Sequence, residues 1–246
     1  MNQPTLFPSR RVGADTDQIG AYIPLPGLGL VPVNAYVIHA REPVLIDTGV
    51  AALGTDFMPA LRRVIDPADL RWIWLTHIDA DHVGNLRAVL AEAPQARIVT
   101  NYLGVGKLGL LQMPLERTYL INPGQSLDVG DRQLLALRPP VYDAPETMAV
   151  FDGRTRHLFS ADCFGAVLAK PAESAAQIAT RDLHEGLFLW GSIDAPWLHQ
   201  VSEDRLTASS QALFDLQPRL ILSSHLPAAS GLNDRLYAAL QAVRKG

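Results

Sequence analysis

Short apolar runs alternate with longer amphipathic segments along the whole chain. The short runs have the length of β-strands and are separated by glycine, proline and charged residues. We expect strands at Ala21–Leu25, Asn34–His39, Val44–Asp47, Trp72–Thr76, Arg97–Thr100, Gln133–Leu137, Met148–Asp152, His157–Ser160 and Leu220–Ser223. Apolar residues at helical spacing predict helices at Asp56–Val64, Asn85–Ala91, Glu203–Leu216 and Asn233–Arg244.

Two groups of strands with intervening helices predict a layered α/β fold, with helices outside and sheets inside. No Gly/Ser-rich linker or low-complexity segment divides the 246 residues. We therefore expect a single domain over residues 1–246, long enough to bury a substantial core.

Composition narrows the function classes. Apolar residues make up 48% of the chain and charged residues 19%, as in ordinary globular proteins. The net charge of −4 gives no reason to expect nucleic acid or an anionic membrane surface as a partner. A single cysteine, Cys163, excludes an intramolecular disulfide. The N-terminus has no signal-peptide pattern, and proline and glycine interrupt the apolar region Ala21–Ala40, so we expect a soluble cytoplasmic protein.

The segment Thr76–Asn85 carries the candidate chemistry. It places four potential metal ligands within six residues, between a predicted strand and a predicted helix: His77, Asp79, Asp81 and His82. His77 and Asp79 alternate along an extended loop and can face one point, whereas Asp81 and His82 suit a second point nearby. Two metal ions are the economical reading. We expect Asp81 to Asn85 to form the first turn of the following helix, where an anionic side chain is favoured.

Later strand ends supply further candidate ligands. Asp162 follows one predicted strand, His225 follows another, and Asp143 comes after the Pro139-Pro140 pair. Strand ends are rigid supports for ligating side chains. For Asp143, a role in orienting a ligand fits as well as direct ligation does. The segment Asp182–Ile193 is expected to cover the site.

These motifs resemble the metallo-β-lactamase superfamily. The matching segments, in the order of that family, are Val44–Gly49, Thr76–Asn85, Ser160–Asp162 and Ser223–His225. The resemblance implies an αββα sandwich with a binuclear metal site at one edge of its two sheets. It also implies that Asp162 bridges the metals and that His225 joins Asp81 and His82 on the second metal. Asp47 is implied as a structural aspartate beside the site, not as a ligand.

A finer resemblance concerns Asp79, where the superfamily motif has histidine. A carboxylate at this position is similar to flavodiiron proteins and to oxygen-binding diiron proteins. Segments Tyr142–Met148, Phe159–Gly165 and Trp190–Ile193 are also similar to that subgroup. The chain departs from it at Asp143, where the subgroup has a histidine ligand. It also reaches Gly246 without a flavodoxin-like domain, so no flavin is expected in this chain. The subgroup further suggests a homodimer.

The charge and the chemical type of the candidate ligands together favour iron over zinc. Four aspartates would bring four negative charges, enough to neutralise two divalent ions: Asp79, Asp81, Asp143 and Asp162. Mixed histidine and carboxylate sets suit iron and manganese, whereas sets rich in histidine or thiolate favour zinc. We expect two iron ions, with zinc or manganese as alternatives.

Three functions follow from such a site. The first is a diiron oxidoreductase that binds dioxygen or a related small oxidant and needs an external electron donor. The second is a hydrolase acting on a small-molecule substrate, in which a metal-bridging hydroxide attacks and Asp81 accepts a proton as the catalytic residue. The third is a non-catalytic gas sensor. The residues locate the metals and leave the substrate open.

Overall fold

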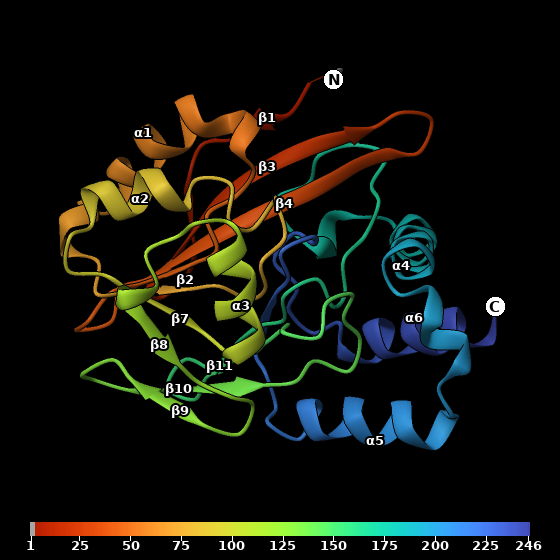
Figure 1. Ribbon diagram of the computed structural model, residues 1–246. Helices are drawn as coiled ribbons and strands as arrows, with labels where there is room; N and C mark the ends of the chain where they lie inside the picture. The colour runs from red at the N-terminus through yellow and green to blue at the C-terminus, as the bar shows by residue number, and fades with distance from the viewer. Residues whose placement is uncertain (1–2) are drawn as a thin grey trace.

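Two β-sheets pack face to face in the computed structural model, which describes residues 3–246 (Figure 1). The first sheet runs in the order β1-β3-β4-β5-β6-β7-β8, and β2 pairs with β3. Its long antiparallel hairpin β3–β4 is followed by parallel strands β5 to β8. The strands are β1 (Thr5–Leu6), β2 (Arg10–Gly13), β3 (Thr16–Leu25), β4 (Gly29–Ile38), β5 (Val44–Ile46), β6 (Trp72–Trp74), β7 (Arg97–Thr100) and β8 (Thr118–Leu120).

The second sheet has five strands in the order β13-β12-β11-β10-β9. Only the pair β12–β13 is parallel among them. The strands are β9 (Ser126–Asp128), β10 (Gln133–Leu137), β11 (Ala149–Asp152), β12 (His157–Phe159) and β13 (Leu220–Leu222). Inward-facing side chains of both sheets, such as Trp74 and Phe159, form a shared core between them.

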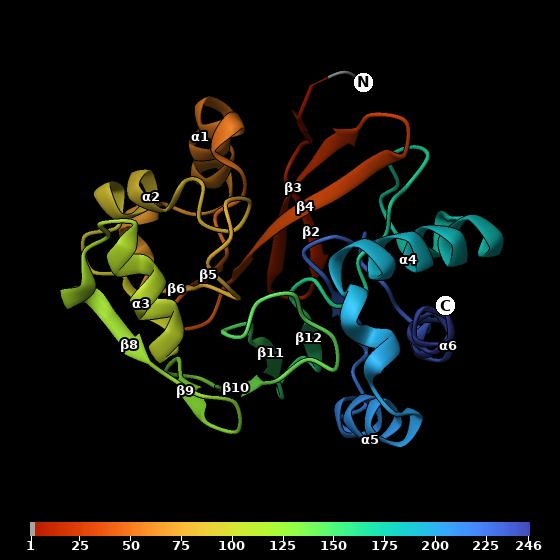
Figure 2. The ribbon, with the colours of Figure 1, turned by 45° about the vertical axis from the view of Figure 1, so that its right-hand side comes forward.

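Helices cover the two outer faces. Figure 2 shows α1–α3 on one side of the molecule and α4–α6 on the other, with the strands between. Two further apolar cores bury these helices against the sheets, because each helix keeps one apolar face. The helices are α1 (Gly54–Val64), α2 (Leu86–Glu92), α3 (Tyr102–Leu110), α4 (Thr180–Asp194), α5 (Glu203–Phe214) and α6 (Asn233–Lys245). The predicted αββα sandwich is therefore confirmed.

Most predicted elements are present, with shifted ends. The prediction of a helical first turn over Asp81 to Asn85 is wrong, because α2 begins at Leu86 and this stretch forms successive turns. Helices α3 and α4 and the short strands β1, β2, β8 and β9 were not predicted. Among residues 3–246, no helix combines the length and the apolar content needed to span a membrane.

Candidate metal centre

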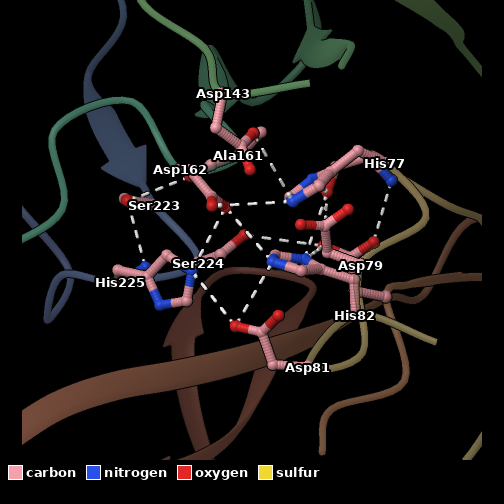
Figure 3. A network of polar contacts seen from close by, with 12 residues as sticks. His77, Asp79, Asp81, His82, Asp143, Ala161, Asp162, Ser223, Ser224 and His225 are labelled. Carbon is pink, nitrogen blue, oxygen red and sulfur yellow. Dashed lines mark hydrogen bonds and ion pairs between the residues drawn. The ribbon is translucent and has the colours of Figure 1, made fainter. Parts of the chain in front are cut away.

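Loops from both sheets meet at one edge of the sandwich (Figure 3). The loop after β6 carries His77, Asp79, Asp81 and His82. The second sheet contributes Asp143 before β11, Asp162 after β12 and His225 after β13. The carboxyl ends of parallel strands point the same way, which brings these loops together. All seven candidate ligands expected from the sequence lie in this one cluster.

Asp162 lies at the centre of the cluster. Its Oδ1 is 3.2 Å from Nε2 of both His82 and His225, and its Oδ2 is 3.5 Å from Nε2 of His77. The side chain is only 6% exposed. A carboxylate in this position has one oxygen facing each half of the cluster, as a bridging ligand requires.

The other candidate ligands divide into two groups on either side of Asp162. His77, Asp79 and Asp143 form the first group, which together with Asp162 we call the carboxylate-rich position. Asp81, His82 and His225 form the second, which together with Asp162 we call the histidine-rich position. Within each group of three, the potential ligand atoms lie within 4.8 Å of one another. His77 and His82 also form a close group with Asp162, so the assignment of His77 and Asp79 to one metal and of Asp81 and His82 to the other stays a prediction.

Unpaired polar atoms test whether this cluster fits metal ions. Nε2 of His77, His82 and His225 and Oδ1 of Asp162 are buried and have no hydrogen-bond partner among the described residues. They lie close to one another, but without the alignment that a hydrogen bond needs. A buried polar atom left unpaired costs free energy, so a converging set of four is unusual in a folded protein. Cations would satisfy all of them, and the cluster therefore fits a binuclear centre.

Neighbouring acceptors orient the histidines of the histidine-rich position. Nδ1 of His82 lies 2.9 Å from Oδ2 of Asp47, and Nδ1 of His225 lies 2.7 Å from the carbonyl oxygen of Pro32. A proton on Nδ1 leaves the Nε2 lone pair free for a metal. Asp47 is itself fixed, because it accepts hydrogen bonds from the backbone N–H and the hydroxyl of Thr76. Asp47 belongs to none of the close groups of potential metal ligands.

Without a metal ion, the cluster carries shifted pKa values. Burial alone would raise the pKa of Asp162, but the charges of His225, His77 and His82 hold it well below its ordinary value. Burial would likewise lower the pKa of His225, yet the charges of Asp162 and Asp81 raise it to about 9. Near neutral pH, His225 is therefore a charged imidazolium with a proton on each nitrogen. A metal ion must displace the proton on Nε2.

The sequence analysis missed Asp194, which lies at the end of α4. Its carboxylate oxygens form a third close group with those of Asp143 and Asp162. Burial and these two negative charges raise the pKa of Asp194 to about 8. Trp190, one turn earlier, donates to the carbonyl oxygen of Asp162 at 3.1 Å, and its ring centroid lies 4.5 Å from that of His225. Two signals pointed to this region: the expectation that Asp182–Ile193 covers the site, and the family resemblance of Trp190–Ile193; neither included Asp194.

Lys107 and Glu146 were also missed. Nζ of Lys107, on α3, lies 2.5 Å from Oε1 of Glu146 and 3.7 Å from Oδ1 of Asp79. Glu146 is fully buried, and its second oxygen has no partner among the described residues. Glu146 falls inside the segment Tyr142–Met148 that carried the family resemblance, whereas Lys107 had no motif.

Comparison with known proteins shows the family to which this chain belongs. The family model described as "ODP family beta lactamase" matches residues 31–225. The chain belongs to this family. It is also similar to the anaerobic nitric oxide reductase flavorubredoxin of Klebsiella pneumoniae, with 31% identity over 134 residues that cover 54% of this chain and 28% of the relative.

Solved structures agree with the fold of this ODP-family chain. Rubredoxin oxygen:oxidoreductase from Desulfovibrio gigas superposes with a TM-score of 0.82 and 20% identity, covering 96% of this chain and 61% of that one. The flavodiiron protein from Giardia intestinalis has a TM-score of 0.84 and 15% identity, covering 99% of this chain and 61% of that one. The match to the first curated relatives spans 38% or less of their length, so these comparisons describe a shared core.

Proposed function

We propose that this chain holds two iron ions and reduces dioxygen or a related small oxidant such as nitric oxide. The observation that carries the proposal is the pair of ligand groups that share Asp162, with unpaired histidine nitrogens aimed between them. The names of the similar proteins, a nitric oxide reductase and an oxygen oxidoreductase, support the substrate class.

One ion would be held at the carboxylate-rich position and the other at the histidine-rich position. Three imidazoles and four carboxylates form a mixed nitrogen and oxygen set, which suits iron or manganese better than a thiolate-containing set would. When bound, an iron pair supplies electrons to the oxidant by changing oxidation state. The protein's part is to fix the geometry, to aim the histidines through Asp47 and the Pro32 carbonyl, and to cover His225 with Trp190.

The electron donor and the assembly state belong to the proposal as well. We propose that an electron donor supplies the site. The names of the similar proteins, a flavorubredoxin and a rubredoxin oxygen:oxidoreductase, support this part of the proposal. The homodimer suggested by the resemblance stays a prediction, which sedimentation analysis of the purified chain would check.

Metal analysis joined to oxidant consumption tests the proposal. The chain, expressed with iron, zinc and manganese all available, is expected to contain about two irons. After anaerobic reduction, dioxygen or nitric oxide should change its absorption spectrum and be consumed repeatedly with an added reductant. His225→Ala should lose metal and activity, whereas His199→Ala, at an exposed position, should retain both.

Other outcomes would overturn it. Zinc-loaded protein that turns over esters or phosphodiesters, and loses that activity in Asp81→Ala, would establish a hydrolase. Stoichiometric gas binding without turnover under several reductants would establish a sensor.

A further inference from the structure

Lys107 places a fixed positive charge beside one half of the metal cluster only. Its Nζ lies 3.7 Å from Oδ1 of Asp79, a candidate ligand of the carboxylate-rich position. The histidine-rich position has no such neighbour among the ion pairs of the described residues. We propose that Lys107 competes with metal for Asp79, so that the histidine-rich position fills first and the carboxylate-rich position binds its ion more weakly. This inference rests on the proposed binuclear function.

The ammonium group of Lys107 is held in place. Its closest partner is Oε1 of Glu146, at 2.5 Å, and the Glu146 side chain is inaccessible to solvent. Moving Lys107 away would leave a buried carboxylate uncompensated, which is strongly unfavourable. Helix α3, which carries Lys107, is tied to the same segment, because Asn101 caps the helix through Gly104 and donates to the carbonyl oxygen of Glu146 at 2.7 Å. The charge therefore stays within reach of Asp79.

The two positions also differ in preorganisation. In the histidine-rich position, His82 and His225 are about 1% exposed, and each has an acceptor on Nδ1 that aims Nε2 inward. Its third ligand, Asp81, is 31% exposed. The carboxylate-rich position has one buried imidazole, His77, beside the side chains of Asp79 and Asp143, which are 43% and 25% exposed. Ligands held by neighbouring hydrogen bonds lose less freedom when a metal binds. The second buried and oriented imidazole of the histidine-rich position and the Lys107 charge beside the other position favour the same order of loading.

The inference is tested on the metal-loaded full chain. The protein is dialysed anaerobically against buffers that hold free Fe²⁺ at stepped concentrations, and the iron retained per chain is measured at each step. Wild type should release its two ions in separate steps, with dissociation constants about tenfold or more apart. His77→Ala should abolish the weaker step, and His225→Ala should abolish the tighter one.

Variants of Lys107 then isolate its charge. Lys107→Met should tighten the weaker step about tenfold and leave the tighter step unchanged within about twofold, whereas Lys107→Arg, which keeps the charge, should resemble wild type. Because Lys107→Met leaves Glu146 unpaired and negative, the matched variant is Lys107→Met/Glu146→Gln. It removes both charges together, and it should still bind the weaker ion more tightly than wild type does.

Three results separate the possible failures. If the double variant matches wild type, Lys107 only neutralises Glu146 and the inference is overturned. Equal affinities at both positions in wild type would overturn the inference and leave the binuclear proposal standing. A wild-type chain that retains fewer than two metal ions at saturation would overturn the proposed function itself.

Discussion

At the scale of single residues, Asp47 provides a test of a residue that orients a metal ligand without binding the metal itself. Its Oδ2 lies 2.9 Å from Nδ1 of His82, and its other oxygen accepts the backbone N–H of Thr76. Asp47→Asn keeps the size but replaces one acceptor with a donor, so His82 loses its fixed tautomer. Metal affinity at the histidine-rich position should fall about 10- to 100-fold, as measured by the same stepped dialysis. Asp17→Asn is the matched control, because Asp17 pairs with His39 outside the site at 2.7 Å; an equal loss in both variants would contradict this role.

His225 predicts how metal affinity depends on pH. Its pKa is raised to about 9 in the metal-free protein, so below that pH a metal ion must displace a proton from the imidazole. The apparent affinity for Zn²⁺, used as a redox-inert probe, should therefore fall as pH drops from 9 to 6. The contribution of His225 is up to about tenfold per pH unit. Calorimetry in buffers of different ionisation enthalpy should show proton release on binding, and a flat profile would contradict the prediction.

The sequence located the seven clustered residues because their spacing carries the signal. Four of them stand within six residues, and Asp162 and His225 each follow a strongly apolar strand. Asp194 and Lys107 carry no comparable signal. Each is a single charged residue on a helix that was not predicted, and it reaches the site only through tertiary packing. Local pattern therefore finds the candidate ligands and misses the charged residues that pack beside them.

At the scale of elements, the missed helix α3 has a physical explanation. Three of its nine residues are glycine, which lowers intrinsic helix propensity by about 1 kcal/mol each relative to alanine. The Asn101 cap and the burial of Leu108 compensate, and neither contact is visible in periodicity. Strands β8 and β9 have three residues each and are only partly apolar. Strands β5 and β6 are equally short, but they were predicted because their three residues are all apolar.

The ligand loop also depends on close packing at Gly84. Gly84 donates to the carbonyl oxygen of Gly49 at 2.9 Å, and a methyl group on its Cα would overlap that oxygen and the backbone nitrogen of Ala51. Gly84→Ala should destabilise the fold by about 1–3 kcal/mol. It should also weaken metal binding, because the added methyl group would push the loop after β6 away from the segment that follows β5. Gly106→Ala is the control: its side chain would meet nothing within 4 Å in α3, so it should be neutral or stabilising by up to about 1 kcal/mol. Urea unfolding and metal content measure both, and equal effects would contradict the packing argument.

At the scale of the whole molecule, the candidate metal cluster lies where the two halves of the sandwich meet. The loop after β6 belongs to the first sheet, whereas Asp143, Asp162 and His225 belong to the second. The shared core between the sheets makes the same connection through apolar contacts. Metal binding at the edge of the sandwich and apolar packing in its core would therefore both stabilise the interface between the two sheets. Neither sheet alone carries the complete set of candidate ligands.

This arrangement predicts one cooperative unfolding transition that moves with metal. Because ligands from both sheets must separate when the chain unfolds, metal bound at about 100 times its dissociation constant should stabilise the folded state by about 2.7 kcal/mol. For a chain of this size, that corresponds to a rise in Tm of about 5–10 °C. Calorimetry of metal-loaded and chelator-treated protein should show single transitions separated by that amount. Two transitions, with only one shifted by metal, would mean that the halves unfold independently and that the cluster does not couple them.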